Sequence, residues 1–118
     1  MSDDVTVWFN AQCSKCRTTQ GILQERGVDA DYVKYLESAP TKDELRRVIA
    51  LLGESSPRAI ARTGEAVWKE LGLASAGDDE ILDAMVANPI LIERPIVIRG
   101  DRAVIGRPPE NVLELLDD

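Results

Sequence analysis

The sequence contains no histidine, only two cysteines, and few aromatic residues, which make up 4% of the chain. Without histidine, a second cysteine pair would be needed to complete a structural zinc site of the usual kind, and there is none. We therefore expect no metal centre. In a chain with this composition, two cysteines favour redox or catalytic use over a structural staple.

Long hydrophobic runs are also absent from the sequence. Its longest apolar runs fall far short of the roughly 20 residues that a membrane span requires. The start of the chain, Met1-Ser2-Asp3-Asp4, is acidic, and the apolar run after it is too short for a signal peptide. We expect a cytoplasmic protein with no membrane partner.

The sequence has fewer basic than acidic residues, 14 Lys and Arg against 21 Asp and Glu, which gives a net charge of −7. General nucleic-acid binding requires a basic face, so we expect no nucleic-acid partner. A local basic pocket remains compatible with this balance. The 118 residues, 44% of them hydrophobic, fit a single domain spanning 1–118, which we expect to be a monomer.

The order of predicted elements indicates an α/β fold. β-branched and aromatic residues at 5–9 and 30–35 predict two buried strands, and a helix from about Ser14 to Arg26 lies between them. This βαβ unit is followed by a helical insertion at about 41–88 without strand signals. A hairpin of strands 95–99 and 102–105 with a primed turn at Gly100-Asp101 comes next, and a last helix runs from Pro108-Pro109 through Leu116.

Within the insertion, the best-marked helix begins after Thr41. Thr41 and Glu44 have the spacing of a capping box, and apolar residues at 45, 48, 49 and 52 follow in helical phase. Residues 57–62 and 66–71 predict a short helical turn and a short helix, and 75–77 a loop. Asp78 is predicted to cap a further helix that ends at Asn88-Pro89.

Both cysteines lie in the loop and first helical turn after the first strand, Asn10-Ala11-Gln12-Cys13-Ser14-Lys15-Cys16-Arg17. If Cys13 is the N-cap, the free amides that follow it and the positive charge of Lys15 favour its thiolate and form an oxyanion cradle. Cys16, three residues on, can reach Cys13 as a resolving thiol. The competing interpretation is that both cysteines are small apolar residues under the helix.

Three arginines have distinctive settings in the sequence. Arg94 and Arg107 each precede a proline at the hairpin ends, and Arg62 lies in the irregular part of the helical block. The planar fork of arginine suits tetrahedral oxyanions, whereas the plain alternative is a surface charge. The Arg94-Pro95 bond is a candidate cis peptide, although the sequence does not fix its isomer.

Four stretches together resemble the glutaredoxin-linked arsenate reductase (ArsC-like) family, nearly over the whole chain and in order. They are Asn10-Ala11-Gln12-Cys13-Ser14, Tyr35-Leu36-Glu37, Asn88-Pro89-Ile90-Leu91-Ile92-Glu93-Arg94-Pro95-Ile96-Val97 and Gly106-Arg107-Pro108-Pro109-Glu110. The resemblance implies a thioredoxin-like fold with a helical insertion and reduction of arsenate to arsenite.

The resemblance also implies roles for individual residues. Cys13 matches the thiol that attacks arsenate, and Arg62, Arg94 and Arg107 match the arginines that hold the oxyanion, beside Ser14 and Lys15 in the loop. No bound cofactor is implied, and glutathione with glutaredoxin, or thioredoxin, would be the reductant. Two departures stand out: Phe9 occupies the position where many members carry histidine, and Cys16 offers an internal resolving thiol.

Two alternatives are left open by the sequence. Spx-type regulators share the fold, a Cys-x-x-Cys and an Arg-Pro-Ile segment, and they bind RNA polymerase through a redox switch. The stretch Gly106-Arg107-Pro108-Pro109-Glu110 favours the reductase over that branch. The other alternative is a general thiol-disulfide oxidoreductase.

Overall fold

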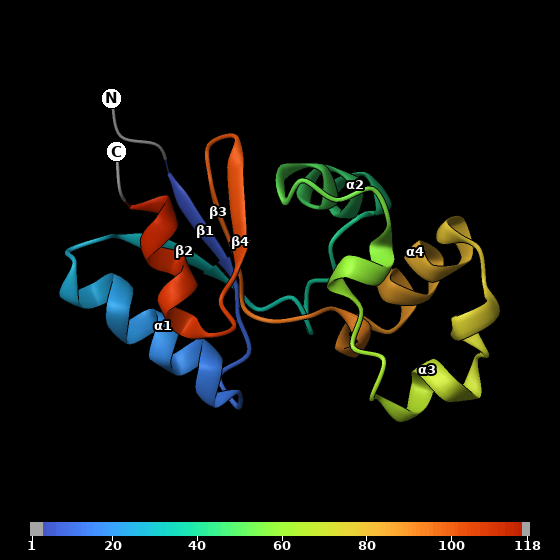
Figure 1. Cartoon of the computed structure of the whole chain (residues 1–118). Helices are drawn as coiled ribbons and strands as arrows, with labels where there is room; N and C mark the ends of the chain where they lie inside the picture. The colour runs from blue at the N-terminus through green and yellow to red at the C-terminus, as the bar shows by residue number, and fades with distance from the viewer. Residues whose placement is uncertain (1–3, 117–118) are drawn as a thin grey trace. The chain divides into compact units, whose positions relative to one another are not determined.

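The computed structural model describes residues 4–116, and Figure 1 shows its helices and strands. The helices and strands are β1 (Val5–Trp8), α1 (Ser14–Glu25), β2 (Ala30–Val33), α2 (Lys42–Leu51), α3 (Ala66–Glu70), α4 (Asp78–Ala87), β3 (Ile96–Arg99) and β4 (Arg102–Ile105). Four 3₁₀ segments complete the described chain: η1 (Pro57–Ile60), η2 (Leu73–Ser75), η3 (Pro89–Leu91) and η4 (Pro109–Leu115). None of the helices among residues 4–116 is long and apolar enough to cross a membrane.

The four strands form one mixed sheet in the order β2-β1-β3-β4. β1 pairs in parallel with β2, with Trp8 opposite Val33, and antiparallel with β3, with Trp8 opposite Ile96. The parallel pair with α1 as its crossover is the predicted βαβ unit. The strand and helix predictions for residues 5–33 are confirmed to within two or three residues at the ends.

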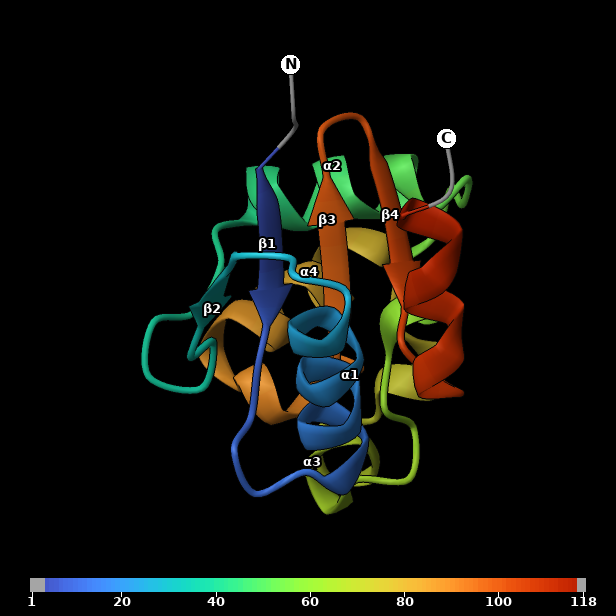
Figure 2. The ribbon, with the colours of Figure 1, turned by 90° about the vertical axis from the view of Figure 1, so that its left-hand side faces the viewer.

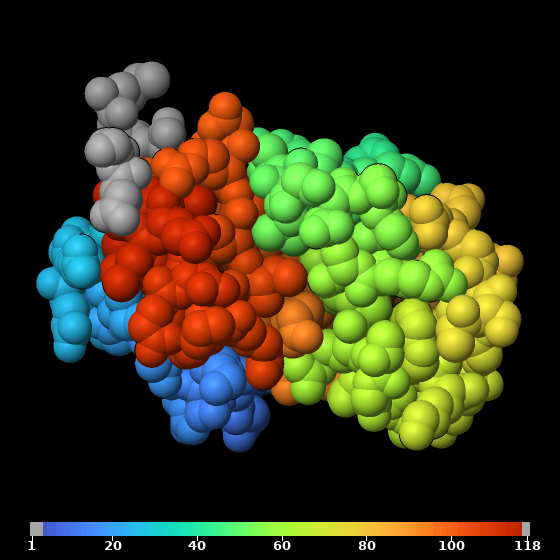
Figure 3. All heavy atoms as spheres, in the orientation of Figure 1, coloured from blue at the N-terminus to red at the C-terminus, as the bar shows by residue number. Residues whose placement is uncertain are grey.

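Residues up to Tyr35 and from Arg94 onward form one compact unit, which contains the whole sheet. α1 and η4 lie against one face of this sheet, as Figure 2 shows. Burial of the apolar side chains of strand, helix and η4 stabilises that arrangement. The core of this layer consists of Val5, Val7, Phe9, Cys13, Cys16, Leu23, Val97, Val112 and Leu115. In Figure 3, η4 forms an outer surface of this unit.

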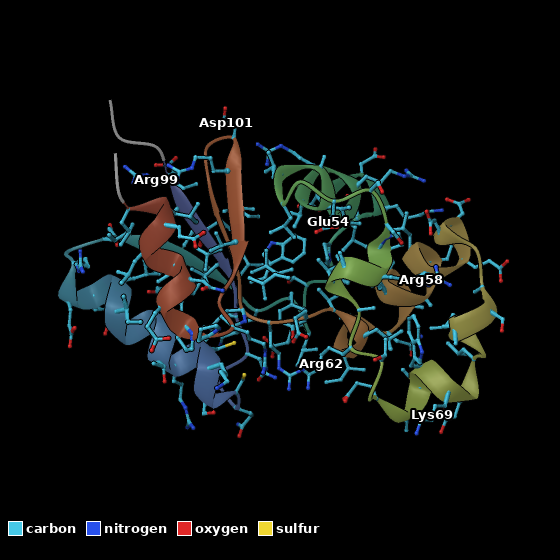
Figure 4. The ribbon with its side chains drawn as sticks, in the orientation of Figure 1. Glu54, Arg58, Arg62, Lys69, Arg99 and Asp101 are labelled. Atoms are coloured by element: carbon cyan, nitrogen blue, oxygen red, sulfur yellow. The ribbon has the colours of Figure 1, made fainter. Side chains whose placement is uncertain are left out.

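The β3–β4 hairpin turns on Gly100-Asp101, as predicted. Gly100 has φ of 61°, which glycine adopts without the steric cost that a Cβ brings, and Asp101 is not in the left-handed region. A positive φ at the first central residue alone fits a type II′ turn, whose twist matches the strands. Asp101 stands at the tip of the hairpin in Figure 4.

Residues 36–93 form a second compact unit, which is helical apart from a single bridge between Ala61 and Ile92. The capping box of α2 is confirmed: the Thr41 hydroxyl accepts from the Glu44 amide at 3.1 Å, and the Thr41 amide donates to the Glu44 carboxylate at 3.0 Å. Ion pairs join α2 to α4, from Lys42 to Asp79 and Asp83. The predicted helical insertion at 41–88 falls inside this unit.

Three local predictions differ from the structure. The N-cap of α4 is Gly77 and not Asp78, because the Asp78 carboxylate instead accepts hydrogen bonds from Ser56 and Arg58. The predicted loop at 75–77 begins inside η2. The last helix is a 3₁₀ segment with i to i+3 bonds such as Asn111 amide to Pro108 carbonyl, a form common in segments too short to sustain an α-helix.

Candidate active site

One edge of the sheet collects four segments of the chain. Cys13 and Tyr35 follow the carboxyl ends of the parallel strands β1 and β2. Arg94 precedes β3 and Arg107 follows β4, and these two strands are antiparallel with Ile96 opposite Ile105. Continuing that register sets Arg94 opposite Arg107 at the edge where β1 ends. The topology therefore brings Cys13 to the same edge as two arginines that follow it by more than 80 positions in sequence.

Cys13 is the N-cap of α1, as predicted, with φ of −91° and ψ of 122°. Its side chain is almost fully buried, and burial by itself disfavours ionisation of the thiol. Hydrogen bonds from the Cys16 amide, the Arg94 side chain, the Cys16 thiol and the Lys15 amide outweigh burial. Together they lower the pKa of Cys13 from 9.0 to about 7. Near neutral pH a large share of Cys13 is thus the nucleophilic thiolate.

Arg94 and Arg107 both approach the sulfur of Cys13. Arg94 is hydrogen-bonded to it, and this bond raises the pKa of Arg94 in spite of partial burial. Arg107 Nη2 lies 3.7 Å from Cys13 Sγ, while its Nε donates to the Arg94 carbonyl at 2.6 Å. The Arg94-Pro95 and Arg107-Pro108 peptides are both cis. Two guanidinium groups and a helix N-terminus thus surround one sulfur.

Cys16 lies in the first turn of α1 and is fully buried. Burial is the largest effect on this thiol and raises its pKa to about 11, the neighbouring Cys13 adds to the rise, and the Asn10 amide opposes it. The two free thiols are hydrogen-bonded. At neutral pH Cys16 is therefore the protonated partner that donates to the Cys13 thiolate, an electrostatic split typical of neighbouring thiols.

The other predicted site residues lie as follows. Ser14 and Lys15 are exposed in the first turn of α1, and it is the Lys15 backbone amide that reaches the Cys13 sulfur. Arg62 belongs to the unit of residues 36–93, two positions after the end of η1, and is labelled in Figure 4. There its Nη1 forms a 2.8 Å ion pair with Glu93. Its backbone amide also donates to the Leu91 carbonyl at 2.8 Å.

Two residues at this edge were missed from the sequence as site residues. Tyr35 is fully buried, and its proximity helps to raise the pKa of Arg94. Asn111 donates from its side chain to the carbonyls of Ile105 and Arg107 at 3.2 and 3.1 Å. The sequence did contain a signal that Arg94 and Arg107 lie opposite each other. The two-residue turn at Gly100-Asp101 fixes the register of the hairpin, and this register pairs the two arginines.

Phe9, which stands where the resemblance would place histidine, is buried in the core of the first unit. Its ring meets Tyr32 edge-on, with centroids 5.3 Å apart and an interplanar angle of 73°. It supplies packing and no charge, so the backbone amides, Cys16 and the arginines provide the stabilisation of the thiolate. Residues 4–116 contain no cluster of three or more acidic or cysteine side chains arranged to hold a metal ion.

A thioredoxin-like fold with a thiolate at a helix N-terminus and two arginines defines the class of this protein. The sequence model of the ArsC family matches residues 8–115, and the chain belongs to this family. The structure is similar to that of an arsenate reductase from Vibrio cholerae, with a TM-score of 0.92 and 41% identity over 97% of this chain and 98% of that one.

Sequence relatives agree with this assignment. The Escherichia coli (strain K12) arsenate reductase is 39% identical over 117 residues, which cover 98% of this chain and 82% of the relative. Another relative from the same organism, described as the uncharacterized protein YfgD, is 43% identical over 118 residues and is covered to 99% of its length. The comparisons do not favour a polymerase-binding regulator or a general thiol-disulfide oxidoreductase.

Proposed function

We propose that this protein is an arsenate reductase in which Cys13 is the nucleophile. The observation that carries the proposal is the pair of arginines at the Cys13 sulfur, with Arg94 hydrogen-bonded to it and Arg107 Nη2 at 3.7 Å. Relatives named arsenate reductase at 38–39% identity support the choice of substrate. A thiolate between guanidinium groups is suited to a tetrahedral oxyanion, which both attracts donors and accepts a nucleophile.

The chemistry proceeds in two steps on this geometry. The Cys13 thiolate attacks arsenic(V), a sulfur–arsenic bond forms, and an arsenate oxygen leaves as hydroxide or water. A second thiolate then attacks the Cys13 sulfur, and the electron pair of the sulfur–arsenic bond stays on arsenic, which departs as arsenite. The two sulfurs remain as a disulfide, so two thiols supply the two electrons that arsenic gains. The arginines stabilise the negative charge on the arsenate oxygens in both steps.

The resemblance to the arsenate reductases also assigns Arg62, Ser14 and Lys15 to substrate binding. The ion pair of Arg62 with Glu93 gives the Arg62 side chain a fixed orientation within the unit of residues 36–93. Ser14 and Lys15 present the amides and the charge of the first turn of α1, where anions bind favourably. These three assignments are tested by substitution and not by the contacts of the free protein.

The second thiol comes from glutathione with glutaredoxin, from thioredoxin, or from Cys16. Cys16 is hydrogen-bonded to the nucleophile, so an internal attack requires little movement of the first helical turn. Because burial raises the pKa of Cys16 to about 11, this thiol carries its proton at neutral pH. An attack by its sulfur on Cys13 therefore releases that proton as the disulfide forms.

A coupled assay tests the proposed activity. Purified protein is supplied with arsenate, NADPH and either glutathione, glutaredoxin and glutathione reductase, or thioredoxin and thioredoxin reductase. We expect arsenate-dependent NADPH consumption in one of the two systems and none with Cys13→Ser. Folded protein that consumes no NADPH with either system would contradict the proposal.

The role of Cys16 is tested with Cys16→Ser in the same two assays. If Cys16 resolves the adduct, the variant loses thioredoxin-driven turnover and accumulates Cys13 adduct, which intact-mass measurement detects. Equal turnover of the variant and the wild type would make the external thiol the resolving group. Thr18→Ser, a substitution on the exposed side of the same helix, is the matched control and should retain full turnover.

A further inference from the structure

Gly106 lies between the end of the β3–β4 hairpin and α1. It directly follows β4 and is buried. Its amide donates to the Pro95 carbonyl at 2.8 Å, which continues the antiparallel pairing of β3 with β4 by one residue. Arg94 precedes Pro95 and Arg107 follows Gly106, so this bond joins the two segments that carry the arginines of the site.

The structure leaves no room for a side chain at Gly106. A Cβ at this position would lie 2.7 Å from Pro95 Cγ and 2.9 Å from Thr19 Oγ1. Carbon atoms in contact are about 3.5–4.0 Å apart, and the Pro95 ring is closed on its own backbone and cannot rotate away. Thr19 belongs to α1 and is fully buried, and its hydroxyl has no hydrogen-bond partner among the described residues. Packing alone therefore sets how closely α1 approaches the hairpin here.

The same contact determines how far Arg107 lies from Cys13. Cys13 caps α1 fewer than two turns before Thr19, and Arg107 is the residue after Gly106. Arg107 Nη2 lies 3.7 Å from Cys13 Sγ, and Arg107 Nε donates to the Arg94 carbonyl at 2.6 Å. The second of these bonds ties the guanidinium to the hairpin. A separation of α1 from the hairpin would therefore lengthen the contact between Arg107 and the sulfur.

We infer that Gly106 is a positioning residue of this site, because its lack of a side chain lets α1 and the hairpin approach closely enough for both arginines to reach the Cys13 sulfur. Gly106 does not touch the reacting atoms and acts through Arg94 and Arg107. The other titratable group at the sulfur, Cys16, belongs to α1 and moves with Cys13. The effect of Gly106 on arsenate turnover rests on the proposed function, whereas its effect on the thiol does not.

Gly106→Ala tests the inference, and Gly21→Ala is its matched control. Gly21 lies in α1, and a Cβ there would meet nothing within 4 Å. The two variants therefore add the same atom to the same compact unit. Only Gly106→Ala forces α1 and the end of the hairpin apart, by about 0.5–1 Å if the contacts return to ordinary distances.

The first readout is the rate of alkylation of Cys13 by iodoacetamide as a function of pH, with the modified residue located by mass spectrometry. Only the thiolate reacts, so the profile reports the thiol pKa without any arsenate. Withdrawal of positive charge from the sulfur should raise the pKa of Cys13 by about 0.5 in Gly106→Ala and slow alkylation at pH 6.5 about threefold. Gly21→Ala should match the wild type. Equal profiles for the two variants would overturn the inference.

A background in which both arginines are replaced, Arg94→Met with Arg107→Met, shows whether Gly106 acts through them. In this background Gly106→Ala should leave the alkylation profile unchanged, because the amides and the Cys16 thiol that remain at the sulfur belong to α1. An effect of Gly106→Ala that persists without the arginines would overturn the inference.

If Gly106→Ala does not fold, Thr19→Val approaches the same contact from α1. Valine places a methyl group, which is larger than the hydroxyl, against Gly106. It also removes a buried hydroxyl without a partner, so the variant should remain folded. Alkylation of Cys13 at pH 6.5 should be about twofold slower in Thr19→Val than in the wild type. An unchanged profile would overturn the inference.

Arsenate turnover provides the second readout. Gly106→Ala should lower kcat/KM about tenfold, a loss expected when reacting groups are displaced by less than 1 Å, and Gly21→Ala should stay within about twofold of the wild type. If the wild type does not turn over arsenate, the proposed function fails but the alkylation profile still decides the role of Gly106. If the wild type turns over arsenate and the two variants behave alike in both assays, only the role of Gly106 is lost.

Discussion

Cys13 owes its reactivity to a competition between burial and hydrogen bonding. Its low exposure works against ionisation, yet the amides of Cys16 and Lys15, the Cys16 thiol and the Arg94 guanidinium donate to the sulfur and bring its pKa to about 7. Cys16 has a similar position in sequence, but its complete burial and the neighbouring charge keep it protonated. The two thiols therefore have different roles at neutral pH: Cys13 is the nucleophile and Cys16 is the proton donor.

The pH dependence of thiol reactivity follows from these values. A thiol reacts as thiolate, so alkylation of Cys13 should increase with pH through a midpoint of about 7, whereas an ordinary thiol has its midpoint near 9.0. Cys16 should stay unmodified below pH 9, because its pKa is about 11 and its side chain is buried. Iodoacetamide labelling with peptide mapping measures both. Equal labelling of the two cysteines at pH 7 would contradict the assignment.

Removal of either arginine at the sulfur should impair turnover. We expect Arg94→Ala to lower kcat/KM about 100-fold, the usual loss on removing one preorganised oxyanion donor. Arg107→Ala should reduce kcat/KM as well, and should leave the thiol pKa closer to the wild-type value, because its 3.7 Å contact with Cys13 is long. Arg26→Ala, an exposed arginine at the end of α1, is the control and should turn over normally. Normal kinetics for Arg94→Ala would contradict the proposed site.

Elements contribute to the site mainly through their ends. Cys13 lies between the carboxyl end of β1 and the N-terminus of α1, and Arg94 and Arg107 lie at the open end of the β3–β4 hairpin. η4 holds the end of this hairpin, because the Asn111 side chain donates to the carbonyls of Ile105 and Arg107 on either side of Gly106. The backbone that carries Arg107 is therefore fixed by a side chain from the following element.

Asn111→Ala should loosen the segment that carries Arg107. Loss of two side-chain hydrogen bonds should lower the free energy of unfolding by about 1–2 kcal/mol and reduce kcat/KM. Asn111→Asp lacks the amide donors but has the same shape, and it should behave like the alanine variant. Denaturant unfolding and steady-state kinetics measure the two effects. If Asn111→Ala keeps wild-type stability, these bonds contribute nothing to the hairpin end.

The capping box gives an element-scale prediction that is independent of the chemistry. Thr41→Ala removes the side-chain acceptor of the Glu44 amide and should destabilise the protein by about 1 kcal/mol. Thr18→Ala is the matched control, because the Thr18 hydroxyl only donates back to the Ser14 carbonyl within α1, a bond with no stabilising capping role. Urea denaturation of the three proteins compares them, and equal midpoints would contradict the capping role.

At the scale of the whole molecule, the described surface exposes few large hydrophobic side chains. Only Leu36 and Leu71 are large hydrophobic residues that are exposed among residues 4–116, at 41% and 52%. Stable self-association requires a contiguous apolar patch, which two separate leucines do not provide. The ion pairs of α2 with α4 are exposed and contribute little to stability.

We therefore predict a monomer in solution. Sedimentation equilibrium should give a mass of 13.0 kDa with no dependence on concentration between about 10 and 100 µM, because residues 4–116 expose only two large hydrophobic side chains for a dimer interface. The net charge of −7 adds mutual repulsion at low salt. A mass that rises toward twice this value across the series would contradict the prediction.

The sequence by itself determined the elements, the capping of α1 by Cys13 and the capping box of α2, since these depend on residues a few positions apart whose periodicity and spacing are visible in the chain. It also provided the resemblance that selected the arginines. Its local predictions were wrong where a side chain binds a partner distant in sequence. The Asp78 carboxylate accepts hydrogen bonds from Ser56 and Arg58, and Asp78 does not cap α4.

Only the tertiary structure decided which side chains meet. Parallel and antiparallel pairing bring Cys13, Tyr35, Arg94 and Arg107 to one edge of the sheet, and burial sets the opposite pKa directions of the two cysteines. The contact of Arg107 with Cys13 joins positions 94 residues apart and has no signature in local sequence. Strand pairing and desolvation are non-local, so they become visible only when the chain is folded.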